Sequence, residues 1–204
     1  MHFRTVLEHV SEIIRKKDFE QAEEVLLEAR TRAVVEGDIQ TRALILSELV
    51  ELYCIMDPPQ LAKAEALSRE RESLTGSAYS RLQTAMILHH GAHDFTRAVP
   101  KLEEAIAQGR TEQDEKTVYT ALSLLGEASL ELGRNEQAIR ALGQLEQMVE
   151  RKEKFVVGDE TRFLEALHLR HVEPERVIRL ASTLASVCRD RAFKERLQTL
   201  SMLS

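Results

Sequence analysis

The sequence predicts an all-α protein built from repeated helix pairs, and two observations lead to this fold class. The first is composition. Good helix formers such as Leu, Ala, Glu, Arg and Gln dominate, whereas glycine (8), proline (4) and aromatic residues (4%) are scarce. A β-rich domain would need more turn residues and more aromatic and β-branched side chains. The second observation is a series of apolar residues at helical spacing that recurs about every 39 residues.

The clearest copy of this unit begins near Tyr119. Apolar residues at intervals of three and four, from Leu122 to Leu132, predict an amphipathic helix. Gly133 then interrupts the pattern, and a second apolar series that begins at Ala138 predicts another helix. The unit is therefore expected to consist of a helix, a tight turn and a second helix.

Similar units lie on both sides of this copy. We expect them at residues 3–39, 40–78, 79–118, 119–157 and 158–190. Such regular spacing is hard to obtain from unrelated helices. Two helices alone cannot bury an apolar face, whereas a row of stacked pairs shares one continuous core. We therefore predict that residues 1–204 form a single helical-repeat domain of about five helix pairs.

The last stretch, residues 191–204, is predicted to be a capping helix that covers the open end of the array. Phe193, Leu197 and Leu200 have helical spacing within it. Together with Met202 and Leu203, these apolar residues also offer an alternative, which is homo-oligomerisation through the C-terminal helix.

Short motifs at fixed places in the helix pair carry a family resemblance. The fourth unit has a Leu-Gly pair in its first helix and a small residue early in its second, at Leu125, Gly126, Gly133, Ala138 and Leu142. Phe19 and Phe95 lie at the inter-helix turns of two other units. This pattern resembles the tetratricopeptide repeat (TPR) family over residues 3–150, and less closely over 155–190. The unit departs from that family in two ways: Leu122 or Leu82 replaces a large aromatic, and the repeat is nearer ~39–40 residues than 34.

The resemblance implies an α-α superhelix whose first helices line a concave groove that binds a protein or peptide. The non-core positions of those helices are then the candidate partner-binding residues: Arg4, Ser11, Arg15, Glu48, Glu51, Gln83, His90, Thr120, Ser123, Glu127 and Glu131. They are mixed in charge and lack the Lys, Asn and Arg clamp with which some TPR domains hold a terminal carboxylate. The resemblance thus implies a scaffold or adaptor. A regulatory sensor for a small ligand or signalling peptide is the alternative.

Two histidine groups are the main candidates for chemistry. His89 and His93 are four residues apart, and His168 and His171 are three apart, spacings that suit a metal on one helix face. Gly91 lies at an expected turn, which argues against a shared face for the first group. The sequence also has no HExxH, phosphate-binding glycine loop, CxxC or GxSxG motif. We therefore predict no enzyme, no catalytic residue, no metal and no cofactor, with a metal-dependent enzyme as a minor alternative.

Charge and targeting signals point to the cytoplasm. The net charge of −6 disfavours non-specific binding of nucleic acid. The spacing of Cys54 and Cys188 fits no zinc or redox motif, so we expect free thiols in a reducing compartment. The N-terminus does not resemble a signal peptide, and no apolar run approaches the ~18 residues of a membrane span. The expected protein is cytoplasmic and makes no membrane contact.

Overall fold

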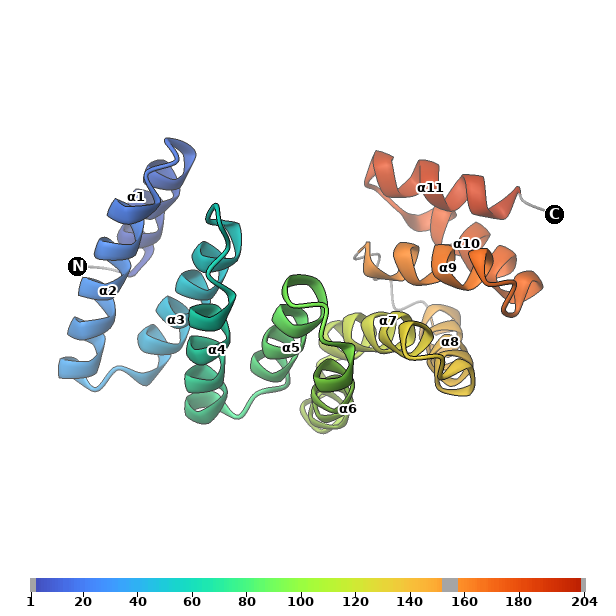
Figure 1. Ribbon diagram of the computed structural model, residues 1–204, viewed down its shortest axis with the longest axis horizontal. Coiled ribbons are helices and arrows are strands. Elements are labelled where there is room, and N and C mark those ends of the chain that lie inside the picture. The colour runs from blue at the N-terminus through green and yellow to red at the C-terminus, as the bar shows by residue number, and fades with distance from the viewer. Residues whose placement is uncertain (1–2, 152–157, 203–204) are drawn as a thin grey trace.

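The computed structural model describes residues 3–151 and 158–202, and every regular element in these ranges is a helix. There are eleven α-helices and one π-helical turn, η1: α1 (Phe3–Arg15), α2 (Phe19–Glu36), α3 (Ile39–Ile55), α4 (Leu61–Thr75), α5 (Ala78–Met86), η1 (Ile87–Gly91), α6 (Phe95–Glu112), α7 (Glu115–Glu131), α8 (Asn135–Glu150), α9 (Asp159–Leu169), α10 (Pro174–Val187) and α11 (Arg191–Ser201). Figure 1 shows α1 to α8 following one another along the long axis of the molecule, whereas α9, α10 and α11 lie above α7 and α8 at one end of it. The predicted all-α fold is confirmed.

Successive helices pack against one another along the array. Each helix from α1 to α7 contacts the next one in the chain, and α10 contacts both α9 and α11. Three further contacts between α-helices skip a helix, because α5 lies against α7, α9 lies against α7 and α11 lies against α9. Five helix pairs, α1–α2 to α9–α10, thus stack into a superhelix that ends in the C-terminal helix α11, as the sequence predicted.

The first helices of the pairs begin close to the expected unit starts. They begin at Phe3, Ile39, Ala78, Glu115 and Asp159. The largest difference is at the fourth unit, where the apolar series suggested a start near 119. There the helix begins earlier because Asp114 caps it, its Oδ1 accepting a hydrogen bond from Thr117 N (3.1 Å). The end of the fourth unit (152–157) and the end of the cap, including Leu203, lie outside the described residues.

Aspartate side chains cap the start of five helices. Each accepts a hydrogen bond from the backbone N–H three residues further on: Asp18, Asp38, Asp94, Asp114 and Asp190. Such a cap satisfies one of the free N–H groups at a helix start. The caps at 18 and 38 recur at 94 and 114, an interval of 76 residues in both cases. In the first and third units, an aspartate therefore caps the start of the second helix, and another aspartate caps the start of the helix that follows it.

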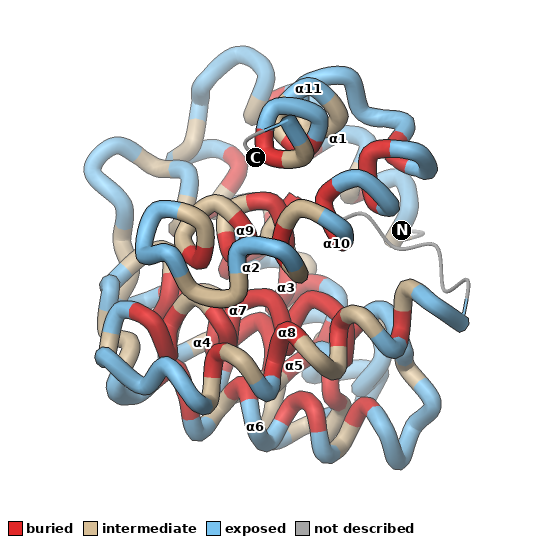
Figure 2. Tube along the Cα trace, turned by 90° about the vertical axis from the view of Figure 1, so that its right-hand side faces the viewer, coloured by how far each residue is buried: buried red, intermediate tan, exposed pale blue. Residues whose placement is uncertain are grey.

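Helix α7 lies at the centre of the larger core. Figure 2 shows it buried along most of its length, with α9 and α8 beside it. Gly126 sets how closely α9 approaches, because a Cβ at this position would come within 2.5 Å of Phe163 Cε1. The Leu-Gly pair that carries the family resemblance is thus also the point of contact between the first helices of the fourth and fifth pairs.

The apolar core has two parts that meet at α5 and η1. Buried residues of α1–α4 form one cluster, to which η1 contributes Ile87. Buried residues of α5–α11 form the other, to which the same segment contributes Leu82 and Leu88. Segment α5–η1 therefore joins both halves of the array. Within the described part of the chain, no helix combines the length and apolar character needed to cross a membrane.

The C-terminal helix α11 uses its apolar side within the array. Leu197 and Leu200 are buried, and the ring of Phe193 packs where a Cβ at Gly158 would otherwise lie. Only Met202 among the described apolar residues named for self-association is strongly exposed, at 76%. The apolar side of α11 faces α9 and α10, so it is not free to join a second copy of the chain.

Candidate functional site

All eleven residues predicted to line a groove lie on the first helices of the pairs. We call the surface formed by α1, α3, α5–η1, α7 and α9 the first-helix face. Five of the residues are exposed: Arg4, Ser11, Arg15, Glu51 and Glu131. Three are half-buried: Glu48, His90 and Glu127. Three are buried, contrary to the expected open groove lining: Gln83, Thr120 and Ser123.

Among the buried residues of this set, Gln83 joins three helices, whereas Ser123 bonds within its own helix. Gln83 Nε2 donates a hydrogen bond to Ser47 Oγ on α3 (2.9 Å), and Gln83 Oε1 accepts one from Arg71 Nη1 on α4 (3.2 Å). Ser123 Oγ donates to the carbonyl oxygen of Tyr119 one turn earlier (3.1 Å). Gln83 is buried because α3, α4 and α5 meet around it, and Thr120 and Ser123 are buried because α5 and α9 cover α7. Helical periodicity alone does not reveal this covering.

An apolar pocket of about 500 Å³ opens between α3 and α5–η1. We call it the α3–η1 pocket. Its main apolar lining comes from both helices: Val50, Cys54, Ile55, Tyr79, Met86 and Ile87. Ile55 and Tyr79 remain 52% and 44% exposed, so apolar surface at the pocket meets water. Glu51, Gln83 and His90 add polar groups to the lining. An apolar hollow with a few polar groups is the usual character of a binding pocket, and its volume is within the common range of about 300–1,000 Å³.

Gly91 and Leu61 close one end of this pocket. Both residues line it, and a Cβ at Gly91 would lie 2.7 Å from Leu61 Cδ2. The glycine therefore lets the start of α4 pack against η1, the contact that joins these two elements.

Two carboxylates lie on the α3 side of the pocket. Glu51 is part of the lining, and Glu48 lies one turn earlier on the same side of the helix. Burial, and then repulsion from Glu51, raises the pKa of Glu48. Within residues 3–151 and 158–202, neither carboxylate is in an ion pair. Burial and the charge of Glu51 also raise the pKa of the Cys54 thiol, which therefore stays protonated and acts as apolar lining.

A polar cluster lies on the other side of His90, where η1, α7 and α9 meet. Arg162 Nη2 lies 2.9 Å from His90 Nδ1, 3.3 Å from Glu127 Oε2 and 3.4 Å from Asp159 Oδ1. His89 Nδ1 lies 3.1 Å from His90 Nδ1. Arg162 Nη2 also lies 3.3 Å from His90 Nε2, and because a guanidinium only donates hydrogen bonds, the imidazole of His90 must act as the acceptor. His90 thus belongs to both the pocket and the polar cluster.

Burial is the main influence on the charges in this cluster. Together with the nearby positive charge of Arg162, burial lowers the pKa of His89 to about 3 and that of His90 to about 4. Burial also raises the pKa of Glu127 and of Asp159, an effect that Arg162 opposes. At neutral pH the two imidazoles are therefore uncharged. With both carboxylates ionised, one guanidinium faces two negative charges.

The histidine spacings noted in the sequence do not bring the rings together as a ligand set. His89 is buried in η1, whereas His93 lies beyond that turn, is exposed, and has a φ of 50°. His168 lies in the last turn of α9, and His171 lies after the helix with a φ of 54°. Over the two ranges that the structure describes, no group of three or more His, Cys, Asp or Glu side chains could hold a metal ion.

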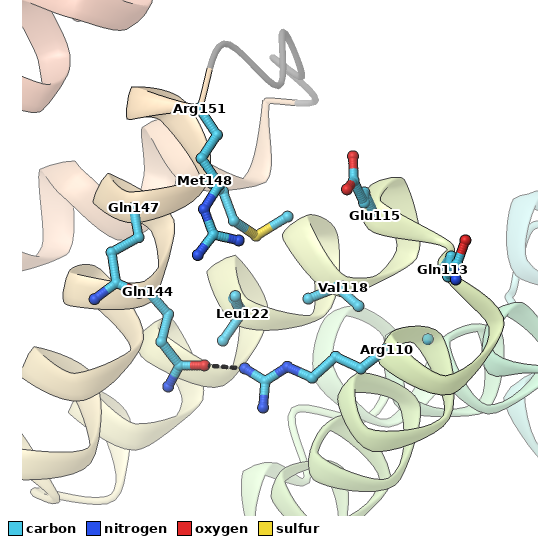
Figure 3. A pocket seen from close by; sticks show the side chains of 10 residues that line it. Arg110, Gln113, Glu115, Val118, Leu122, Gln144, Gln147, Met148 and Arg151 are labelled. Atoms are coloured by element: carbon cyan, nitrogen blue, oxygen red, sulfur yellow. Dashed lines mark hydrogen bonds between the residues drawn. The ribbon is translucent and has the colours of Figure 1, made fainter.

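A second, more polar hollow of about 380 Å³ lies between α6, the start of α7 and α8 (Figure 3). Arg110 from α6 and Arg151, which follows the end of α8, extend toward it, beside Val118 and Leu122 of α7. Arg110 donates a hydrogen bond to Gln144 Oε1 across the gap. This bond joins the second helices of two neighbouring pairs, so part of the polar lining serves the array itself.

Several residues of the pocket and the cluster were not among the predicted groove residues: Cys54, Ile55, Tyr79, Asp159 and Arg162. A signal for Ile55 was present, because Glu48, Glu51 and Ile55 recur at intervals of three and four on one helix face. No comparable signal marked Arg162, since the sequence does not show that α9 crosses α7 and points toward η1.

No protein-family model matches the chain, and no curated protein matches it significantly. The fold and the site define the class of protein to which the chain belongs: an all-α array of stacked helix pairs, with the α3–η1 pocket and the polar cluster on its first-helix face.

Proposed function

We propose that the protein is a protein- or peptide-binding scaffold of the TPR type, and that its partner binds on the first-helix face. The α3–η1 pocket carries the proposal. Ile55 and Tyr79 keep much of their apolar surface in water at the pocket, and burial of such surface is the main favourable term in association. A partner side chain in the pocket would cover both residues.

Three further features support a TPR-type scaffold. The chain folds into stacked helix pairs, Phe19 and Phe95 begin the second helices of the first and third pairs, and Gly126 of the Leu-Gly pair lies at a helix crossing. A grooved helical array suits recognition of a helix or an extended peptide. Helix pairs stacked in this way present a long surface made of several units, so a partner would contact more than one pair.

The proposal assigns no catalytic step to the polar cluster. The imidazole of His90 already accepts a hydrogen bond from Arg162, and burial with the charge of Arg162 lowers the pKa of this histidine to about 4. Glu127 and Asp159 lie against the same guanidinium. Groups that are paired with one another in this way position helices and shape the charge of the surface.

A second candidate function is a regulatory sensor that binds a small apolar ligand. The size and apolar lining of the α3–η1 pocket favour this candidate as well. The two functions differ in which residues the bound molecule should protect from hydrogen exchange. A partner peptide should also contact α3 outside the pocket, whereas a small ligand should protect only the pocket lining, which hydrogen exchange of the bound protein distinguishes.

A double substitution at the pocket tests the proposal. The pocket variant, Ile55→Gln/Tyr79→Gln, removes exposed apolar surface from the opening without a change in charge. Its matched control, Val34→Gln/Val35→Gln, removes apolar side chains that are 50% and 82% exposed at the end of α2. We expect proteins captured from a native lysate by the unsubstituted chain to be lost with the pocket variant and kept with the control. Identical sets for both variants, each verified to melt as a folded protein, would contradict binding on the first-helix face.

A further inference from the structure

We propose that the segment bound by the α3–η1 pocket carries a large apolar side chain with a Lys or Arg close to it. The apolar side chain enters the pocket, and the basic group lies against Glu48 and Glu51. This inference rests on the proposed function, since it specifies the chemistry of the partner that the first-helix face recognises.

The apolar part of the ligand follows from the pocket walls. Val50 and Ile87 form buried surface, while Met86 is half-buried and Cys54 carries a protonated thiol. None of these side chains offers a strong hydrogen-bond donor or acceptor to a ligand. A polar side chain would lose its hydration there with little compensation, whereas Leu, Ile, Met or Phe would not.

The basic part follows from two carboxylates, Glu48 and Glu51, that form no ion pair with any residue that the structure describes. Glu48 and Glu51 are three residues apart on α3, and the repulsion between them contributes to the raised pKa of Glu48. The positive charge of Arg71 acts on Glu51. Its guanidinium is committed elsewhere, with Nε donating to the Ala43 carbonyl oxygen (3.1 Å) and Nη1 donating to Gln83 Oε1 (3.2 Å). A cation from a partner would relieve the repulsion on α3.

The opposite side of the pocket has the same sign of charge. His90 is uncharged at neutral pH, and beyond it Arg162 faces both Glu127 and Asp159. On the two sides of the pocket, four carboxylates therefore outnumber the two guanidinium groups of Arg71 and Arg162. The carboxylates are those of Glu48, Glu51, Glu127 and Asp159. This balance favours a basic segment and opposes an acidic one, because like charges brought together at an interface are costly.

Peptide selection tests the inference without knowledge of the natural partner. A phage-displayed library of random peptides is selected on the full chain, and the binding of enriched peptides is measured by fluorescence anisotropy. The charge variant is Glu48→Lys/Glu51→Lys. Its control, Glu24→Lys/Glu150→Lys, makes the same change in net charge at two exposed glutamates of α2 and α8. The pocket variant and its control complete the set.

We expect enriched peptides to place Lys or Arg within about four residues of a large apolar side chain, the spacing of one helical turn. The charge variant should weaken their binding by about tenfold at low ionic strength, and added salt should reduce this difference. The pocket variant should weaken binding by at least about tenfold, since it removes apolar contact area. Both controls should stay close to the unsubstituted chain.

The outcomes separate the inference from the proposed function. If the pocket variant loses binding but enriched peptides lack basic residues, or the charge variant binds them equally well, the basic partner is overturned and the scaffold stands. If the pocket variant binds the peptides as tightly as its control, the pocket is not the site and both proposals fail. Enrichment of no peptide at all also counts against both. Two alternatives predict different results: a small-ligand sensor gives no peptide enrichment, and a second copy of the chain gives a mass that rises with concentration in light scattering.

Discussion

Phe163 on α9 packs directly against Gly126 on α7, with no space for a Cβ between the ring and the backbone. A methyl group at residue 126 would come within 2.5 Å of Phe163 Cε1, and the ring itself is fully buried. This contact allows α9 to lie against α7. It therefore also sets the distance between Arg162 on α9 and Glu127 on α7, which is 3.3 Å from Nη2 to Oε2.

Substitution Gly126→Ala should destabilise the protein. An added methyl group forces Phe163 away, and overpacking of a core typically costs about 1–3 kcal/mol even though alanine favours helix more than glycine does. Gly143→Ala on α8 is the control, because its Cβ would meet only the flexible end of Arg176, at 3.2 Å from Nη2. Urea unfolding of both variants checks this expectation. Equal unfolding midpoints would show that α9 does not depend on the close approach.

Arg71→Ala should cost more stability than the loss of a surface arginine. The Arg71 side chain is buried, and its removal leaves the Ala43 carbonyl and the Gln83 amide without a donor. Each buried polar group left unpaired costs about 1–3 kcal/mol, so we expect a total loss of about 2–4 kcal/mol. Arg69→Ala is the matched control: Arg69 is exposed and pairs with Glu65, so its loss should cost less than about 1 kcal/mol. Denaturant unfolding should separate the two variants; losses of the same size would refute the structural role of Arg71.

Stability should fall as the pH drops below about 6.5, the ordinary pKa of histidine in an unfolded chain. Burial lowers the pKa of His89 to about 3 and that of His90 to about 4 in the folded protein. The unfolded state therefore takes up protons first, and the stability present above pH 6.5 is lost as the pH falls toward these values. The loss is at most about 1.4 kcal/mol per pH unit for each histidine.

Glu127 and Asp159 act in the opposite direction at lower pH, because their raised pKa values let the folded state take up protons first. The histidine effect is therefore clearest between about pH 6.5 and 5.5, close to the unperturbed pKa of histidine. Unfolding in urea at several pH values measures it. His90→Asn should reduce the pH dependence, whereas His171→Asn, at an exposed turn, should leave it unchanged. The same slope in all three proteins would rule out His90 as a source.

Leu197→Ala should destabilise the C-terminal end of the array, whereas Met202→Ala should have little effect. Leu197 is fully buried in the core and Met202 is 76% exposed, although both were candidates for a self-association surface. Truncation of a buried leucine costs about 2–5 kcal/mol. Thermal unfolding checks the difference in stability, and light scattering checks the mass. A change of mass on substitution of Met202, with no change in stability, would instead favour an interface at this helix.

The candidate site was only partly predictable. The sequence placed Glu48, Glu51 and His90 on first helices, because the helical period assigns them to non-core positions. The same period also selected Gln83 and Ser123, which the structure buries between helices. Periodicity reports one apolar face for each helix, and it cannot show that a second neighbour covers the remaining face. The pocket escaped prediction for the related reason that it forms where two helices do not meet closely.

The sequence by itself determined the local structure: helix-forming composition, apolar spacing and turns with glycine or a capping aspartate specify where helices run and where they stop. These signals act within a few residues, so they can be read along the chain. Only the tertiary structure decided how α9 crosses α7, where α3 and η1 leave a pocket, and that Arg162 joins His90, Glu127 and Asp159. Those features depend on packing between residues as many as 72 positions apart, which no local pattern encodes.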